Sequence, residues 1–131
     1  DETVAKQKAE TARQAAMTPE QRAAEEAAKT KRTAQIQLAG AGAVALKKSM
    51  KDPTAFELTS LVLMPDGTAC YEFRGKNSFG AIFPTSAVAT SKGKLLTQER
   101  DKNAFVKAWN DACTKAGGED LTTIVKQILL D

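Results

Sequence analysis

Two cysteines, Cys70 and Cys113, are the residues of this 131-residue chain whose types most directly suggest chemistry. Cys70 stands in a stretch that alternates like a β-strand, and Cys113 lies on the apolar face of a predicted helix. If that helix packs on the sheet, the two sulfur atoms meet at disulfide distance, and the bond requires an oxidising compartment. The alternative is a pair of buried free thiols. We favour the disulfide, and with it an exported protein.

The chain contains no histidine, which narrows the catalytic chemistry open to it. Without imidazole there is no Ser-His or Cys-His triad, no base to activate a cysteine and no imidazole ligand for zinc. The glycine motifs that bind nucleotide phosphates do not occur either. Asp66 and Asp111 are candidate general bases, but carboxylates in a surface turn or on a helix are far more often structural. We therefore expect no enzyme activity, no cofactor and no metal, with a small hydrolase as a distant alternative.

Aromatic and basic residues follow Cys70 along the predicted strand. Because successive strand residues point to opposite faces, Tyr71 and Phe73 face away from a helix that covers Cys70. Either a second helix covers them as another core layer, which is the simpler interpretation, or a partner does. In the second case they form an aromatic-basic patch with their neighbours. The candidate binding residues are Tyr71, Phe73, Arg74, Lys76 and Asn77.

The length of the chain fits one ordinary domain with a hydrophobic core of its own. The net charge of +3 arises in residues 1–53, where ten Lys or Arg stand against seven Asp or Glu, and is too small to predict a nucleic-acid partner. Residues 29–51 hold six basic residues and no acid, which we interpret as a solvated helix face rather than an anion site. No apolar run is long enough for a membrane span, and peripheral envelope association is left open. The partner we expect is a protein.

The first 42 residues predict an alanine-rich helical extension. Residues 1–17 have little to bury, and we expect frayed helix or disorder there. Thr18 and Gln21 complete a capping box with proline at the first helical position, and helix formers continue to Leu38. Gly40 and Gly42 are expected to interrupt or loosen this helix.

Residues 43–131 predict an α+β domain. A core-facing helical stripe resumes at Ala43 and ends at Asp52-Pro53. Predicted strands span 54–64, with a bulge near Thr59-Ser60, then 68–74 and 79–89, and a short strand or loop runs to Gln98. Turns are expected at 65–67 and 75–78, and Pro84 belongs on an edge or at a bulge. Asp101 should cap the helix that carries Trp109 and Cys113. Asp120 should cap a last segment that forms a helix or, because of its β-branched residues, a strand.

Three short motifs resemble those of a small secreted or lipoprotein domain common in Gram-negative bacteria. These are Leu46–Pro53, Cys70 and Lys76-Asn-Ser-Phe-Gly80, which resemble that family's "LKDP" helix end, cysteine strand and "KNSFGGY" hairpin. The likeness covers about residues 43–115. This chain has Ala81-Ile82 where the family continues Gly-Tyr, and Tyr71 where a glycine follows the cysteine. The resemblance implies a periplasmic or cell-surface α+β domain, of a kind with no assigned enzyme activity.

Together these features predict an exported α+β domain with an antiparallel sheet of three or four strands, a long N-terminal helix and one disulfide. The chain begins at Asp1 rather than Met, and a cleaved export signal is one explanation. The leading functional hypothesis is a non-enzymatic binding module, periplasmic or secreted, with an inhibitor-like module as one form of it. The alternative is a structural or accessory envelope protein that assembles through its N-terminal helix.

Overall fold

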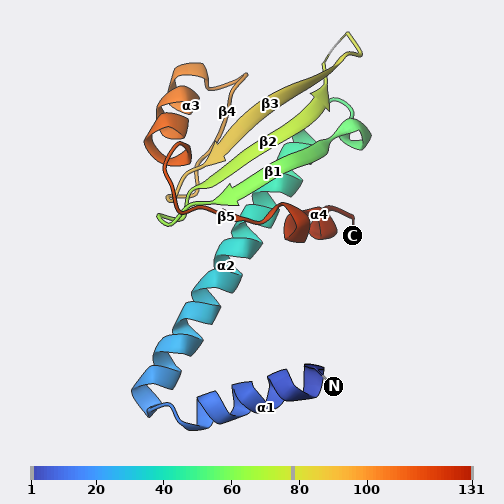
Figure 1. Cartoon of the computed structure of the whole chain (residues 1–131). Helices are drawn as coiled ribbons and strands as arrows, with labels where there is room; N and C mark the ends of the chain where they lie inside the picture. The colour runs from blue at the N-terminus through green and yellow to red at the C-terminus, as the bar shows by residue number, and fades with distance from the viewer. Residues whose placement is uncertain (1, 78, 131) are drawn as a thin grey trace. The chain divides into compact units, whose positions relative to one another are not determined.

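The computed structural model describes residues 2–77 and 79–130, and they form the predicted α+β fold (Figure 1). The chain divides into two compact units, residues 1–34 and residues 35–131. The division falls inside α2 (Pro19–Ser49), eight residues before the predicted boundary after residue 42. The second unit begins earlier because Ala39 and Gly40, which precede that boundary, are already buried.

The first unit contains α1 (Glu2–Ala15) and the start of α2. Residues 2–15 are helical, although none of the side chains of α1 is buried. The capping box is confirmed: the Thr18 N–H donates to Gln21 Oε1 at 2.9 Å, and the Gln21 N–H donates to Thr18 Oγ1 at 3.1 Å. The Arg13 guanidinium joins α1 to α2 through an ion pair of 2.6 Å with Glu25.

Gly40 and Gly42 do not interrupt α2, which runs through both of them. The prediction of an interruption was wrong because these glycines serve a tertiary contact. The Tyr71 hydroxyl donates to the Ala39 carbonyl at 2.7 Å, and a Cβ built on Gly42 would lie 2.3 Å from that hydroxyl oxygen. Glycine at position 42 therefore lets the tyrosine reach the helix backbone, and packing compensates its low helix propensity.

The strands of the described residues are β1 (Glu57–Leu63), β2 (Ala69–Lys76), β3 (Ile82–Ala89), β4 (Leu95–Thr97) and β5 (Glu119–Asp120). They form one antiparallel sheet in the order β4-β3-β2-β1-β5. The register between β1 and β2 shifts between Leu58 and Ser60, as the predicted bulge requires. Pro84 of β3 lies beyond the residues that pair with β4, at a free edge where its missing N–H costs no ladder bond.

The two faces of the sheet are covered differently. One face packs against α2 and against α4 (Thr122–Leu130), and this interface holds the main core. The other face carries α3 (Lys102–Ala108) at one end of the sheet (Figure 1), over a smaller cluster of Val88, Leu96 and Phe105. The main core consists of Ala39, Ala43, Leu46, Leu58, Leu61, Leu63, Ala69, Tyr71, Phe73, Ala87, Leu121 and Val125.

The C-terminal segments decide one alternative that the sequence left open and correct one predicted cap. The last segment is helical, and Asp120 Oδ1 accepts a hydrogen bond from the Thr122 N–H at 2.9 Å, as expected of a cap. Asp101 precedes α3 but makes no side-chain cap, because its Oδ2 accepts from the Thr97 N–H at 2.9 Å instead. After α3 the chain continues through a π-helical turn, η2 (Trp109–Cys113). A short 3-10 turn, η1 (Pro53–Ala55), follows α2.

Candidate functional site

The predicted aromatic residues lie in the core and not on the surface. Tyr71 is 0% exposed and Phe73 is 2% exposed, and both pack in the core between the sheet and α2. Burial raises the pKa of the Tyr71 hydroxyl above its ordinary value, so this group stays protonated and donates its bond to the Ala39 carbonyl. The structure therefore supports the core-layer interpretation, and an exposed patch built on Tyr71 and Phe73 is wrong.

The predicted disulfide is confirmed. Cys70 and Cys113 are bonded, with their Cα atoms 6.0 Å apart, and the bond joins β2 to η2. Cys70 therefore faces the α3 side of the sheet while its neighbour Tyr71 faces α2, as strand parity predicted.

The basic residues of the predicted patch are separated from its aromatic residues. Arg74 is exposed beside Glu72, on a polar part of the sheet that α3 leaves open. Lys76 Nζ lies 3.8 Å from Asp52 Oδ2, and both side chains are partly exposed. The pKa of Asp52 is lowered first by the hydrogen bond from the Thr54 hydroxyl, and more weakly by Lys76. Because Tyr71 and Phe73 are buried, they form no exposed patch with either basic residue.

Asn77 has a clear role in the hairpin that joins β2 to β3. Its side-chain oxygen accepts hydrogen bonds from the Phe79 N–H at 2.9 Å and the Ala81 N–H at 3.0 Å. Its backbone N–H donates to the Ala81 carbonyl at 2.9 Å, and Gly80 takes a φ of 81° that favours glycine. We call residues 77 and 79–82 the hairpin tip; Ser78, part of the predicted 75–78 turn, lies outside the described residues.

The hairpin tip presents two large apolar side chains to solvent. Phe79 is 93% exposed and Ile82 is 66% exposed. Neither residue was predicted to bind a partner, because the sequence pattern placed both in a strand that begins at residue 79. A signal was nevertheless present at Phe79, since an aromatic residue is unusual in a turn of otherwise polar and small residues. Ile82 is the first residue of β3.

We expect Asn77→Ala to loosen the hairpin tip while leaving the domain folded. Two backbone N–H groups would lose their acceptor, at a cost of roughly 1 kcal/mol each, so local opening becomes easier. Hydrogen exchange at the Phe79 and Ala81 amides should accelerate by about tenfold or more, because 1.4 kcal/mol corresponds to tenfold. Asn103→Ala, at an exposed position of α3, is the matched control and should leave these amides unchanged. Unchanged exchange in the Asn77 variant would show that the side chain does not hold the tip.

The two candidate general bases occupy structural positions. Asp66 Oδ1 accepts a hydrogen bond from the Thr68 N–H at 2.9 Å, and this bond is the first cause of the lowered pKa of Asp66. It thereby holds the turn between β1 and β2, where Gly67 has a φ of 93°. Asp111 lies on the exposed surface of η2. Among the described residues, no group of three or more His, Cys, Asp or Glu side chains is arranged to hold a metal ion.

Comparisons with known proteins identified no relative of this chain. No protein-family model, no curated protein and no solved structure matches the chain. The described part of the chain also contains no helix both long and apolar enough to span a bilayer.

Proposed function

We propose that this chain is a non-enzymatic, exported binding module that engages a partner protein through the hairpin tip. The observation that carries the proposal is the 93% exposure of Phe79 on a turn whose backbone is held by Asn77. A large apolar side chain gains roughly 1.5–3 kcal/mol when it moves from water into an apolar site. An exposed phenylalanine on an ordered turn is therefore well suited to anchor an interface.

The hydrogen bonds of the tip strengthen this proposal. Association costs less conformational entropy when the binding loop already has its bound conformation. The Asn77 side chain and the Asn77–Ala81 backbone bond fix the turn that carries Phe79. Ile82 extends the apolar surface by one further exposed side chain. A hydrogen-bonded turn that exposes a large apolar side chain fits a pocket on a partner, as an inhibitor-like module requires.

The export part of the proposal rests on the disulfide. Stable disulfides form in oxidising compartments and are rare in the cytosol. Cys70 and Cys113 are paired across 43 residues of sequence, and the bond ties η2 to β2 beside the smaller core cluster. These facts support a periplasmic or secreted location, in agreement with the bacterial domain that the sequence motifs resemble.

Assembly through the N-terminal helix is the second candidate function, and one observation favours it. α1 is 14 residues long and none of its side chains is buried. Isolated helices of that length are only marginally stable in water, so a partner for α1 would stabilise it. A chain that begins at Thr18 keeps the capping box of α2 and separates the two functions, because only the assembly function would be lost.

Photocrosslinking tests the hairpin-tip proposal. A photoreactive phenylalanine analogue is placed at position 79 in cells of the native host, and at Val106 as control, because Val106 is apolar and 52% exposed on α3. We expect one dominant protein adduct at position 79 that is absent at position 106. Equal adducts at both positions, or none at position 79, would contradict a binding role for the tip.

A further inference from the structure

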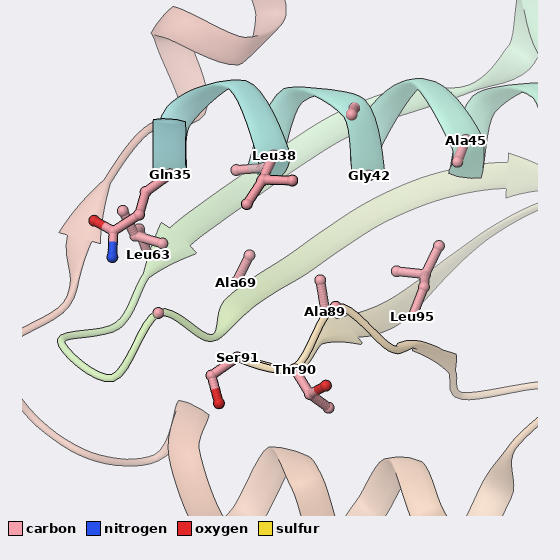
Figure 2. A pocket seen from close by; sticks show the side chains of 14 residues that line it. Gln35, Leu38, Gly42, Ala45, Leu63, Ala69, Ala89, Thr90, Ser91 and Leu95 are labelled. Atoms are coloured by element: carbon pink, nitrogen blue, oxygen red, sulfur yellow. The ribbon is translucent and has the colours of Figure 1, made fainter. Parts of the chain in front are cut away.

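An apolar groove of about 320 Å³ lies in the second unit, between α2 and the strand ends (Figure 2). Ala41, Gly42 and Ala45 form its α2 wall, and Ala69, Ala89 and Leu95 form the wall on the strand side. Leu38 of α2 also lines the groove, although its side chain is 72% exposed. The groove exists because the side chains that face each other across it are small.

The ends of the groove differ in polarity. Figure 2 shows Gln35 at one end, and Ala45 with Leu95 toward the other. Ser91, whose hydroxyl is a hydrogen-bond donor, also lines the groove. The arrangement combines an apolar channel with amide and hydroxyl groups, as ligand sites of known proteins commonly do.

The charged residues nearest to the groove flank its lining in the sequence. None of the described residues that line it is charged, and the exposed Lys92 lies in the chain between the lining residues Ser91 and Gly93. Asp66 precedes the lining residue Gly67 and is the nearest carboxylate in the sequence. It accepts a hydrogen bond from the Thr68 N–H in its own turn and is attracted electrostatically to Lys115. Lys94 interacts electrostatically with Asp101, and this interaction contributes to the lowered pKa of Asp101. An anionic headgroup is therefore favoured beside Ser91 and Lys92.

We propose that this groove binds an anionic amphiphile with a single aliphatic chain, that is, a medium-chain fatty acid. The chain lies along Ala41, Ala45 and Leu95, and the carboxylate is bound by Gln35, Ser91 and Lys92. A cavity of about 150 Å³ holds one benzene molecule, so a groove of twice that volume accepts roughly a dozen carbon atoms. This site is separate from the hairpin tip and does not depend on the function proposed for it.

The test is a titration of the whole, isotopically labelled protein with dodecanoate, followed by amide NMR and kept below the micelle concentration. We expect saturable shifts at Gly42, Gly67 and Gly93, with Gly80 of the hairpin tip unmoved. Ala45→Phe fills the groove and should weaken binding by at least tenfold, whereas Ala104→Phe at an exposed position of α3 should not. Lys92→Glu should weaken dodecanoate binding about fivefold and improve binding of dodecyltrimethylammonium, as the loss of one screened charge contact predicts. Lys107→Glu should change neither.

The proposal is overturned by any of three results. These are the absence of saturable shifts, shifts that centre on Gly80 or α3, and equal affinity of wild type and Ala45→Phe for dodecanoate. Retention of the wild-type melting temperature by each variant shows that the comparison is made between folded proteins. Equal affinities of wild type and Lys92→Glu for both amphiphiles would overturn the anionic headgroup in particular.

Discussion

Replacing Cys70 and Cys113 together by alanine should lower the free energy of unfolding by about 4 kcal/mol. The bond closes a loop of 43 residues, and the chain-entropy model assigns about this stabilisation to a loop of that size. The measurement is chemical denaturation of wild type and double variant, with the wild type also measured in reductant. Reduced wild type and the double variant should have the same midpoint.

The loss should begin at α3 and η2. Among the described residues, the buried cluster on this side of the sheet is small, whereas the main core lies on the other side. It consists of Val88, Leu96 and Phe105, with Ala108 and Trp109 packed against it. Hydrogen exchange in residues 102–113 should therefore accelerate first on reduction, before that of β1 and β2. A change below 1 kcal/mol, or uniform acceleration through the domain, would contradict the anchoring role assigned to the disulfide.

Tyr71→Ala should destabilise the domain by about 3–5 kcal/mol, the range found for large aromatic side chains removed from cores. Tyr71 is 0% exposed, its ring packs in the main core, and its hydroxyl binds the backbone of α2. Thermal and denaturant unfolding measure the effect. The variant should lose most of its cooperative stability, since whole domains commonly have only 5–15 kcal/mol.

Tyr71→Phe is the matched control, because it removes the hydroxyl and keeps the ring. It should cost only about 1 kcal/mol, the net value of one hydrogen bond. The Ala39 carbonyl lies inside α2 and keeps its helical partner, so no buried acceptor is left unpaired. A Tyr71→Ala protein with wild-type stability would contradict the core position and would restore the idea of a binding surface at Tyr71.

The features that the sequence predicted correctly are those that depend on local rules. The capping box at Thr18 and Gln21 is a four-residue pattern with its own hydrogen bonds. The phase shift in the alternation marked the bulge between Leu58 and Ser60. Strand parity placed Cys70 and Tyr71 on opposite faces, because the side-chain period of a strand is two. None of these requires knowledge of distant contacts.

The features that the sequence missed depend on tertiary contacts. Gly42 resembled a helix breaker in the sequence. The contact that requires glycine there is made by the hydroxyl of Tyr71, which lies 29 positions further along the chain. Asp101 resembled a cap, but the Thr97 N–H competes for its carboxylate. The two-residue strand β5 has no periodicity of its own and exists because β1 offers an edge.

The exposed patch considered for Tyr71 and Phe73 was wrong for a related reason. Aromatic residues beside basic ones suggested a surface patch, but whether a strand face is covered depends on where α2 lies. Once α2 covers Tyr71 and Phe73, the aromatic residue left exposed in this part of the chain is Phe79, 93% exposed in the turn itself. The sequence thus drew attention to the hairpin that carries the exposed Phe79, but the aromatic residues it selected there are buried.

The central claim is that Phe79 anchors a partner protein, and one affinity comparison tests it most directly. The protein crosslinked at position 79 is purified, and its dissociation constant is measured with wild type, Phe79→Ser and Val106→Ser. Loss of an interface anchor costs about 2 kcal/mol or more, so Phe79→Ser should bind about 30-fold more weakly or worse. Val106→Ser should bind within twofold of wild type. Equal dissociation constants for all three proteins would contradict the claim that the hairpin tip is the binding site.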